Sequence, residues 1–418
     1  MRLAGLLRKH RPRREALAFL RYIGPGLLVT VGFIDPGNWA SNIAAGAAHG
    51  YALLWMVTLS TLMLIVLQHN AAHLGIATGL CLSEAATRHM RPAASRLVLA
   101  SAMLAAVSTG LAEVLGAALG LSLLVPGLPY RAAAVLVLGV VGVLLFSNSY
   151  PRLEKWIVAF VSLIGLSFLF ELALVRVPWG RAAAGWVVPS LPHGSLPLIM
   201  AVLGAVVMPH NIFLHSEVIQ SRRWHLEDEP VIRRQLKYEF ADTLFSMTVG
   251  WAINSAMIIM AAATFFGGAP VTEVGQAQRM LGPLLGPAAA VVFAAALLLA
   301  GLSSSITAGM AGGSIFAGLF GEPYDVKDLH SRLGAAGTLV AATVIVFLIG
   351  DPFRGLVVSQ MLLSMQLPVT IVTQIRLTSS PKVMGKYANG PALRVLLWTV
   401  AAVVIGLNVA LLKVLIFG

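Results

Sequence analysis

A short polar motif, Asp35-Pro36-Gly37-Asn38, interrupts an apolar run that extends over residues 22–48. Proline removes a backbone donor and clashes with the preceding helical turn, and glycine adds conformational freedom, so we expect a helix to open here and to free backbone carbonyls. The run is long enough to cross a bilayer, which takes about 20 residues. Open backbone at that depth is tolerated where it lines a protein cavity, and an ionisable side chain there indicates a functional site.

The same pattern returns in Met208-Pro209-His210-Asn211, at the middle of the apolar run 196–220. Two broken helices in corresponding positions of two halves are typical of secondary transporters built from inverted repeats, whose binding site lies near the bilayer midplane. We therefore predict that the two motifs meet at one site in the middle of the membrane.

The two motifs together offer the ligands of a metal ion. Asp35 supplies a carboxylate, Asn38 an amide oxygen and Met208 a thioether, and the open turns supply carbonyls near Gly32 and Ala205. Oxygen ligands alone suit magnesium or calcium, whereas a thioether favours softer divalent transition metals. A single carboxylate leaves a divalent cation only partly neutralised, so there is room for coupled proton chemistry.

Four other polar residues at membrane depth each have two or more interpretations. Glu113 is either a neutral, hydrogen-bonded carboxyl or a proton-accepting group. His210 and His215 are candidates for a proton path, a further metal ligand or plain helix packing, since histidine changes charge near neutral pH. Gln360 can lend an amide oxygen to a cation or form a hydrogen bond between helices. The residues alone leave these alternatives open.

The composition places all these residues in an integral membrane protein. Of the 418 residues, 58% are hydrophobic and 11% are charged, and the mean hydropathy is +0.85, which is too apolar for a soluble domain. Period-two alternation is absent, so we expect an all-α protein with about 11 transmembrane helices. The apolar runs are 22–48, 51–75, 97–124, 131–148, 154–176, 196–220, 238–266, 284–318, 334–350, 354–376 and 393–417.

The distribution of charge predicts the topology. The net charge is +12, which in a soluble protein would suggest a nucleic-acid partner. With the basic N-terminal residues 1–21 in the cytoplasm, alternating spans put most of the 29 Lys and Arg residues on the inside, as the positive-inside rule requires. We therefore expect a multi-pass protein of the cell membrane with a cytoplasmic N-terminus, an extracytoplasmic C-terminus and no nucleic-acid partner.

The motifs resemble those of the Nramp (natural resistance-associated macrophage protein) family of divalent metal transporters. Besides the two motifs above, the resemblance includes Leu111-Ala112-Glu113, Leu214-His215-Ser216, Gly301-Leu302-Ser303-Ser304-Ser305, Ser359-Gln360 and Leu407-Asn408. It implies a LeuT-like fold of two inverted five-helix repeats, with helices 1 and 6 broken, plus an eleventh helix. It also implies inward transport of manganese or ferrous iron with protons. We expect no cofactor and no obligatory protein partner.

The resemblance also divides the chain and assigns roles to residues. Asp35, Asn38 and Met208 look like side-chain metal ligands, joined in some conformations by the Ala205 carbonyl and Gln360, with Met208 as the filter against calcium and magnesium. Glu113, His210 and Arg332 match positions of the family's polar proton network. The implied segments are a basic N-terminus (1–21), a first repeat (22–176), an extracellular linker (177–195), a second repeat (196–376), a cytoplasmic loop (377–392) and the eleventh helix (393–418).

One departure from the family pattern concerns the proton route. Family members usually carry aspartate just before Leu-Ala-Glu of the third span, and this chain has Gly110. An uncoupled divalent-metal uniporter is therefore the first alternative, and a related magnesium carrier is the second, although a thioether is a poor partner for a strongly hydrated ion.

Other classes fit the sequence less well. A LeuT-type amino-acid symporter would have to accommodate the repulsion between Asp35 and the substrate carboxylate. The sequence shows no constellation of nucleophilic residues that would indicate an enzyme. It also shows no phosphate-binding loop that would indicate an ATP-driven pump.

Overall fold

The computed structural model describes residues 35–147, 168, 172, 176–220, 228–281 and 286–417. The basic N-terminus 1–21, the first half of the first expected span with Gly32, and nearly all of the fifth span lie outside the described residues. Every regular element within them is a helix, and eight of the described helices are long and apolar enough to cross a membrane, with Tyr130–Phe146 as a shorter apolar helix. The predicted all-α membrane architecture is confirmed.

The long helices follow the predicted apolar runs, but several extend beyond them. The helix α7 begins at Pro92 and α13 at Glu229, before the predicted starts at residues 97 and 238, because a helix continues through charged residues that the bilayer does not enclose. The long and central helices are α4 (Pro36–His49), α5 (Leu54–Thr78), α7 (Pro92–Leu124), α8 (Tyr130–Phe146), α11 (Leu196–Val206), α12 (Pro209–Gln220), α13 (Glu229–Phe265), α15 (Ala289–Gly318), α16 (Leu329–Leu348), α17 (Pro352–Thr378) and α19 (Pro391–Phe417).

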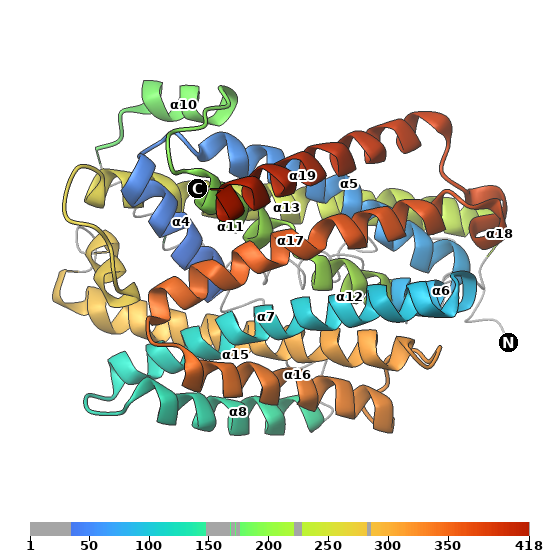
Figure 1. Ribbon diagram of the computed structural model, residues 1–418, viewed down its shortest axis with the longest axis horizontal. Helices are drawn as coiled ribbons and strands as arrows, with labels where there is room; N and C mark the ends of the chain where they lie inside the picture. The colour runs from blue at the N-terminus through green and yellow to red at the C-terminus, as the bar shows by residue number, and fades with distance from the viewer. Residues whose placement is uncertain are drawn as a thin grey trace, which may run out of the picture.

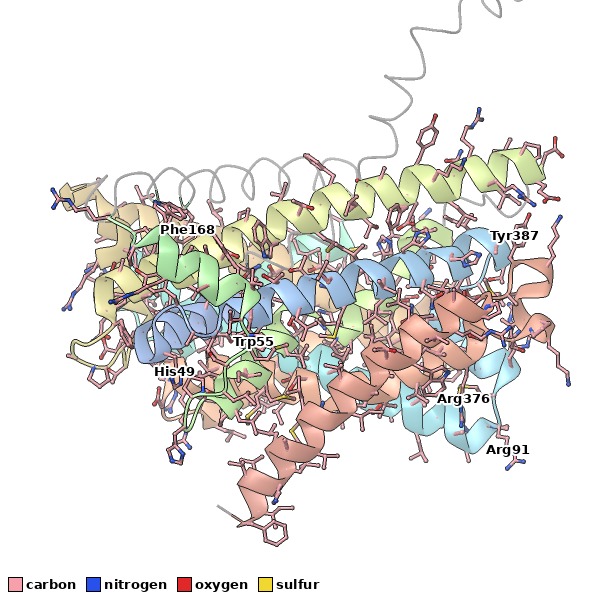
Figure 2. The ribbon with its side chains drawn as sticks, turned by 90° about the horizontal axis from the view of Figure 1, so that it is seen from above. His49, Trp55, Arg91, Phe168, Arg376 and Tyr387 are labelled. Atoms are coloured by element: carbon pink, nitrogen blue, oxygen red, sulfur yellow. The ribbon has the colours of Figure 1, made fainter. Side chains whose placement is uncertain are left out.

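Short helices lie in the connections at the two ends of the bundle. In Figure 2, His49 lies toward one end of the bundle, whereas Arg91, Arg376 and Tyr387 lie toward the other. The connections 79–91 and 379–390 thus share one end, as the predicted alternation of spans requires. The short helices are α6 (Leu82–His89), α10 (Trp179–Val187), η3 (Val274–Leu281), η4 (Gly286–Ala288), α18 (Pro381–Met384) and η5 (Gly385–Tyr387).

Helices α7 and α15 run side by side through the bundle (Figure 1) and their backbones touch. A Cβ atom on Gly301 would lie 2.6 Å from the carbonyl oxygen of Glu113, and one on Gly120 would lie 2.5 Å from the backbone nitrogen of Leu298. Small residues at helix interfaces permit this close approach, which drives helix association in a membrane. Helices α8 and α16 form one edge of the molecule and α10 lies at the opposite edge (Figure 1).

The short helix α6 is hydrogen-bonded to α12 and to α15, near the ends of both helices. The Ser216 hydroxyl of α12 accepts a hydrogen bond from the backbone nitrogen of Leu82 at 2.9 Å, and the Ser83 hydroxyl donates to the Ser314 carbonyl of α15 at 3.1 Å. Cys81 is the only cysteine of the chain and is fully buried just before α6. Its backbone nitrogen donates to Glu84 at 3.0 Å, which caps this helix.

Candidate metal centre

The first motif places Asp35 at the N-terminus of α4. One carboxylate oxygen of Asp35 accepts a hydrogen bond from the backbone nitrogen of Asn38 at 2.6 Å, and the other accepts from the Asn38 side-chain amide at 2.9 Å. Pro36, which lacks an N–H group, occupies the first turn, where no intrahelical partner would have been available. The buried carboxylate thus lies at the positive end of the helix dipole.

The second break lies between α11, which ends at Val206, and α12, which begins at Pro209. In a continuous helix the Ala205 carbonyl would accept from the residue four positions later, but that residue is Pro209, which has no N–H group. The carbonyl instead accepts a hydrogen bond from the Asn38 side chain at 3.0 Å. The two predicted motifs therefore meet, with a direct hydrogen bond between them.

Gln360 of α17 packs against the start of α4 and against α11 next to the second break. A Cβ atom on Gly37 would lie 1.9 Å from the Gln360 side-chain nitrogen, and one on Gly204 would lie 1.8 Å from the Gln360 carbonyl oxygen. At position 204 only glycine fits against the Gln360 backbone, and a side chain at position 37 would displace the Gln360 side chain. The side-chain oxygen of Gln360 is buried and has no hydrogen-bond partner among the described residues, so it is an amide oxygen available to a cation.

Met208 is buried in the second break, with Ala105 of α7 and Leu363 of α17 as apolar neighbours. Its sulfur accepts a hydrogen bond from the Asn211 side chain at 3.1 Å. Asn211 belongs to the same motif but was not among the predicted site residues. It orients the thioether, because a hydrogen bond to one side of the sulfur restricts the rotation of the side chain.

Glu113 lies close to the start of α4. A Cβ atom on Gly116, one turn further along α7, would lie 2.0 Å from the Cβ atom of Pro36. The buried Glu113 carboxyl is hydrogen-bonded to Ser304 of α15 and interacts electrostatically with Asp35. Its second oxygen has no partner in the described part of the chain. Two carboxyl groups in one buried region repel each other when both are ionised, so a proton or a cation stabilises them.

The other two residues of the predicted proton network differ in their surroundings. His210 is buried directly after Pro209, and its Nδ1 atom has no hydrogen-bond partner among the described residues. Arg332 is exposed at the start of α16, with its guanidinium 5.4 Å from the Phe146 ring centroid. Within the described residues, none of its interactions joins it to Glu113 or His210. The structure therefore leaves Arg332 apart from the other two residues.

Gly110 faces α16 across a narrow gap. A Cβ atom at this position would lie 3.3 Å from the Cβ atom of Ala342 and 3.7 Å from the Thr338 methyl group. A small side chain therefore fits with a slight adjustment.

A second polar cluster was missed by the sequence analysis. Glu239 of α13 bridges His69 of α5 and His215 of α12. The signal was present in the sequence, because ionisable residues in apolar helices rarely occur without a buried partner. The spacing along the chain could not show which residues pair.

Comparisons with known proteins show which family the chain resembles. The family model described as natural resistance-associated macrophage protein-like (Nramp) matches residues 26–413. A relative from Ralstonia nicotianae, named divalent metal cation transporter MntH, is 39% identical over 402 residues, which cover 92% of this chain and 89% of the relative. A protein of the same name from Nostoc sp. is 36% identical, with 96% of this chain and 92% of the relative covered.

Solved structures show the same architecture. A manganese transporter of Eremococcus coleocola, solved as a point mutant, superposes with a TM-score of 0.78 at 26% identity, covering 96% of this chain and 87% of the other. The nucleobase-cation-symport-1 transporter Mhp1 superposes with a TM-score of 0.61 at 16% identity, covering 93% and 91%. The latter likeness concerns the fold alone, which is the LeuT fold predicted from the sequence.

Proposed function

Because this chain belongs to the Nramp family and is a multi-pass divalent metal cation transporter rather than an enzyme, we propose that it imports Mn²⁺ or Fe²⁺ through the centre between its two broken helices and that protons move with the metal. The observation that supports this proposal most directly is the hydrogen bond from Asn38 to the Ala205 carbonyl at 3.0 Å. It brings the carboxylate of the first motif next to the open backbone of the second.

The ligand set that we propose consists of Asp35, Asn38 and Met208, with the Ala205 carbonyl and Gln360. The carboxylate and the amide oxygens replace water around the cation, and their small number suits an ion that is released again. The thioether favours a transition metal over the hard ions calcium and magnesium, which gain little from sulfur. The similar protein of Eremococcus coleocola is named a manganese transporter, which supports manganese as the first candidate.

For the protons we propose Glu113 and His210 as the groups nearest the metal that exchange them. Glu113 has one oxygen without a partner, and His210 has one such ring nitrogen, within the described residues. A cation that binds at Asp35 changes the electrostatic interaction between Asp35 and Glu113. Glu113 then releases its proton, and this release couples proton movement to metal binding. The exposed position of Arg332 gives it the weakest support among the proposed proton groups.

Uncoupled metal uniport is the second candidate, and Gly110 favours it because glycine offers no proton-accepting group on the face of α7 that packs against α16. In that case the membrane potential alone drives uptake, at about 2.3 kcal/mol per charge per 100 mV. The predicted orientation, with the N-terminus inside and the repeats 22–176 and 196–376 inverted, applies to both candidates.

The test is uptake into proteoliposomes that contain a metal-sensitive and a pH-sensitive dye. We expect the wild type to take up Mn²⁺ and to acidify the interior in step with it, and Asp35→Asn to abolish both signals. Asp351→Asn is the matched control, since Asp351 also caps a helix that begins with proline but is exposed. Metal uptake without acidification would establish the uniporter, and full uptake by Asp35→Asn would exclude this metal site.

A further inference from the structure

A second group of ionisable side chains is buried between α5, α12 and α13. Glu239 is 3% exposed. One of its carboxylate oxygens lies 3.3 Å from Nε2 of His215, and the other lies 2.5 Å from Nδ1 of His69. The Thr243 hydroxyl donates to the first of these oxygens at 2.7 Å. A single carboxylate thus joins imidazoles from two other helices in one continuous hydrogen-bonded chain.

The two ends of this chain lie in different surroundings. The side chain of His215 is 1% exposed, it lies on the same helix as His210, and its Nδ1 atom has no hydrogen-bond partner among the described residues. The side chain of His69 is 28% exposed. It lines an apolar groove of about 580 Å³ between α5, α13 and α19, and it is the one ionisable residue among the described residues that line this groove. The chain therefore connects the interior of the bundle with its outer surface.

The ionisable partners of Glu239 can both exchange protons near neutral pH. In the described residues no Lys or Arg forms an ion pair with Glu239, and its charged partners are His69 and His215. His73, one turn further along α5, is the other titratable group nearby. It interacts electrostatically with His69 and Glu239, and it is hydrogen-bonded to Asn389. A Lys or Arg partner would keep its charge permanently, whereas imidazole gains and loses a proton near neutral pH.

We propose that His215, Glu239 and His69 form a proton relay that is separate from the metal path. A proton binds to Nδ1 of His215, and the proton on Nε2 passes to the Glu239 carboxylate. The carboxyl group then rotates so that this proton faces His69 and passes it to Nδ1 of His69, and His69 releases the proton from its Nε2 to a water molecule that reaches its partly exposed ring. One proton enters and one leaves, each residue ends with the number of protons that it held at the start, and ring rotation restores the tautomers. The reverse sequence carries a proton the other way.

The relay rests on the proton coupling proposed above and supplies the route on the side of α12 that faces α5 and α13. Neither Glu239 nor His69 belongs to the proposed metal ligands, so removing either should separate proton flow from metal binding. A cluster that only stabilised the fold would instead affect metal uptake and proton flow together.

The variant Glu239→Gln tests the relay, because glutamine keeps the shape of the side chain but cannot take up a proton at neutral pH. In proteoliposomes with both dyes, we expect Mn²⁺ uptake to continue and the ratio of protons to Mn²⁺ to fall by about tenfold or more, as for the loss of a proton-transfer group. His69→Gln should act in the same way with less risk to folding, since His69 is partly exposed. Glu229→Gln is the control, because Glu229 lies in the first turn of the same helix and its side chain is 39% exposed. We expect this variant to keep the wild-type ratio of protons to Mn²⁺.

Each outcome decides between the proposals. Wild-type ratios in both Glu239→Gln and His69→Gln would overturn the relay and leave proton coupling intact. A wild type that carries Mn²⁺ but no protons would overturn coupling and the relay together. A wild type that carries no metal would overturn the transport proposal. In that case the relay is tested by measuring voltage-driven proton flux in the absence of metal. Glu239→Gln must lower this flux if the relay is correct.

Discussion

Asn38 is the residue that joins the two motifs of the proposed metal centre. Its side-chain amide donates one hydrogen bond to Asp35 at 2.9 Å and one to the Ala205 carbonyl at 3.0 Å. These partners are the oxygen atoms that a cation would bind. A cation between them requires the amide to turn its oxygen inward, because an amide nitrogen offers only donors. Depending on the orientation of its amide group, the Asn38 side chain thus either joins the two motifs by hydrogen bonds or offers an oxygen ligand to the metal.

Met208 is predicted to determine the selectivity of the centre. In Met208→Ala the thioether is lost, and with it the preference for a softer metal, whereas the oxygen ligands that suit calcium remain. We expect Ca²⁺ to compete with Mn²⁺ uptake about tenfold more strongly, a difference of about 1.4 kcal/mol in relative affinity. Competition between the two ions in proteoliposomes measures this ratio. Met103→Ala, in which a partly buried methionine of α7 outside the centre is changed, serves as the control.

Gly110 is predicted to tolerate the aspartate that family members carry. A Cβ atom here would lie close to the Ala342 and Thr338 side chains, but 3.9 Å from the Thr338 carbonyl oxygen, so Gly110→Asp should fold. If a proton acceptor on this face of α7 strengthens coupling, the variant takes up more protons per Mn²⁺ than the wild type. The measurement is the proton-to-metal ratio, with Gly110→Asn as the uncharged control. Equal ratios for the wild type and both variants would exclude a contribution of this position to coupling.

At the scale of the helices, the contact between α7 and α15 limits which residues are possible. In Gly301→Ala the new methyl group would lie 2.6 Å from backbone atoms of α7, so the helices must separate. Overpacking of this kind costs about 1–3 kcal/mol. We expect a clearly lower apparent midpoint of thermal unfolding in detergent. Gly337→Ala is the matched control, because its Cβ position faces open space on α16. It should be neutral or slightly stabilising, since alanine favours a helix by about 1 kcal/mol over glycine.

The helices also show what the sequence could and could not predict. The break between α11 and α12 and the start of α4 were predictable because Pro209 and Pro36 act locally, through a missing donor and a steric clash. The position of Gln360 between Gly37 and Gly204 depends on the packing of three helices, which local rules do not determine. The same holds for the pair of Glu239 and His69, which are far apart in the chain. Arg332 was assigned through the family resemblance alone, and only coordinates could show that it is exposed.

At the scale of the whole molecule, the predicted topology places α10 outside the cell and α18 inside it. Arg181 and Lys382 are exposed at these two places. In a Cys81→Ser background, Arg181→Cys should react with a membrane-impermeant maleimide on intact cells, and Lys382→Cys should react only after permeabilisation. Labelling of the two variants in the opposite order would show that the orientation is inverted. Equal labelling of both in intact cells would show that the membranes were not intact.

The position of the single thiol makes its rate of alkylation a measure of conformational change at one end of the bundle. Cys81 is fully buried just before α6, which joins the ends of α12 and α15. Burial, together with the neighbouring Glu217 and Glu84 carboxyls, raises the pKa of this thiol well above its ordinary value. At neutral pH it stays protonated, and only the thiolate reacts with alkylating agents. A small maleimide should therefore react slowly with the native protein and rapidly after denaturation in urea. If α6 moves away from α12 and α15 when metal is released at this end of the bundle, Cys81 becomes accessible. The rate of its alkylation during transport would then measure how often this movement occurs, without any added label.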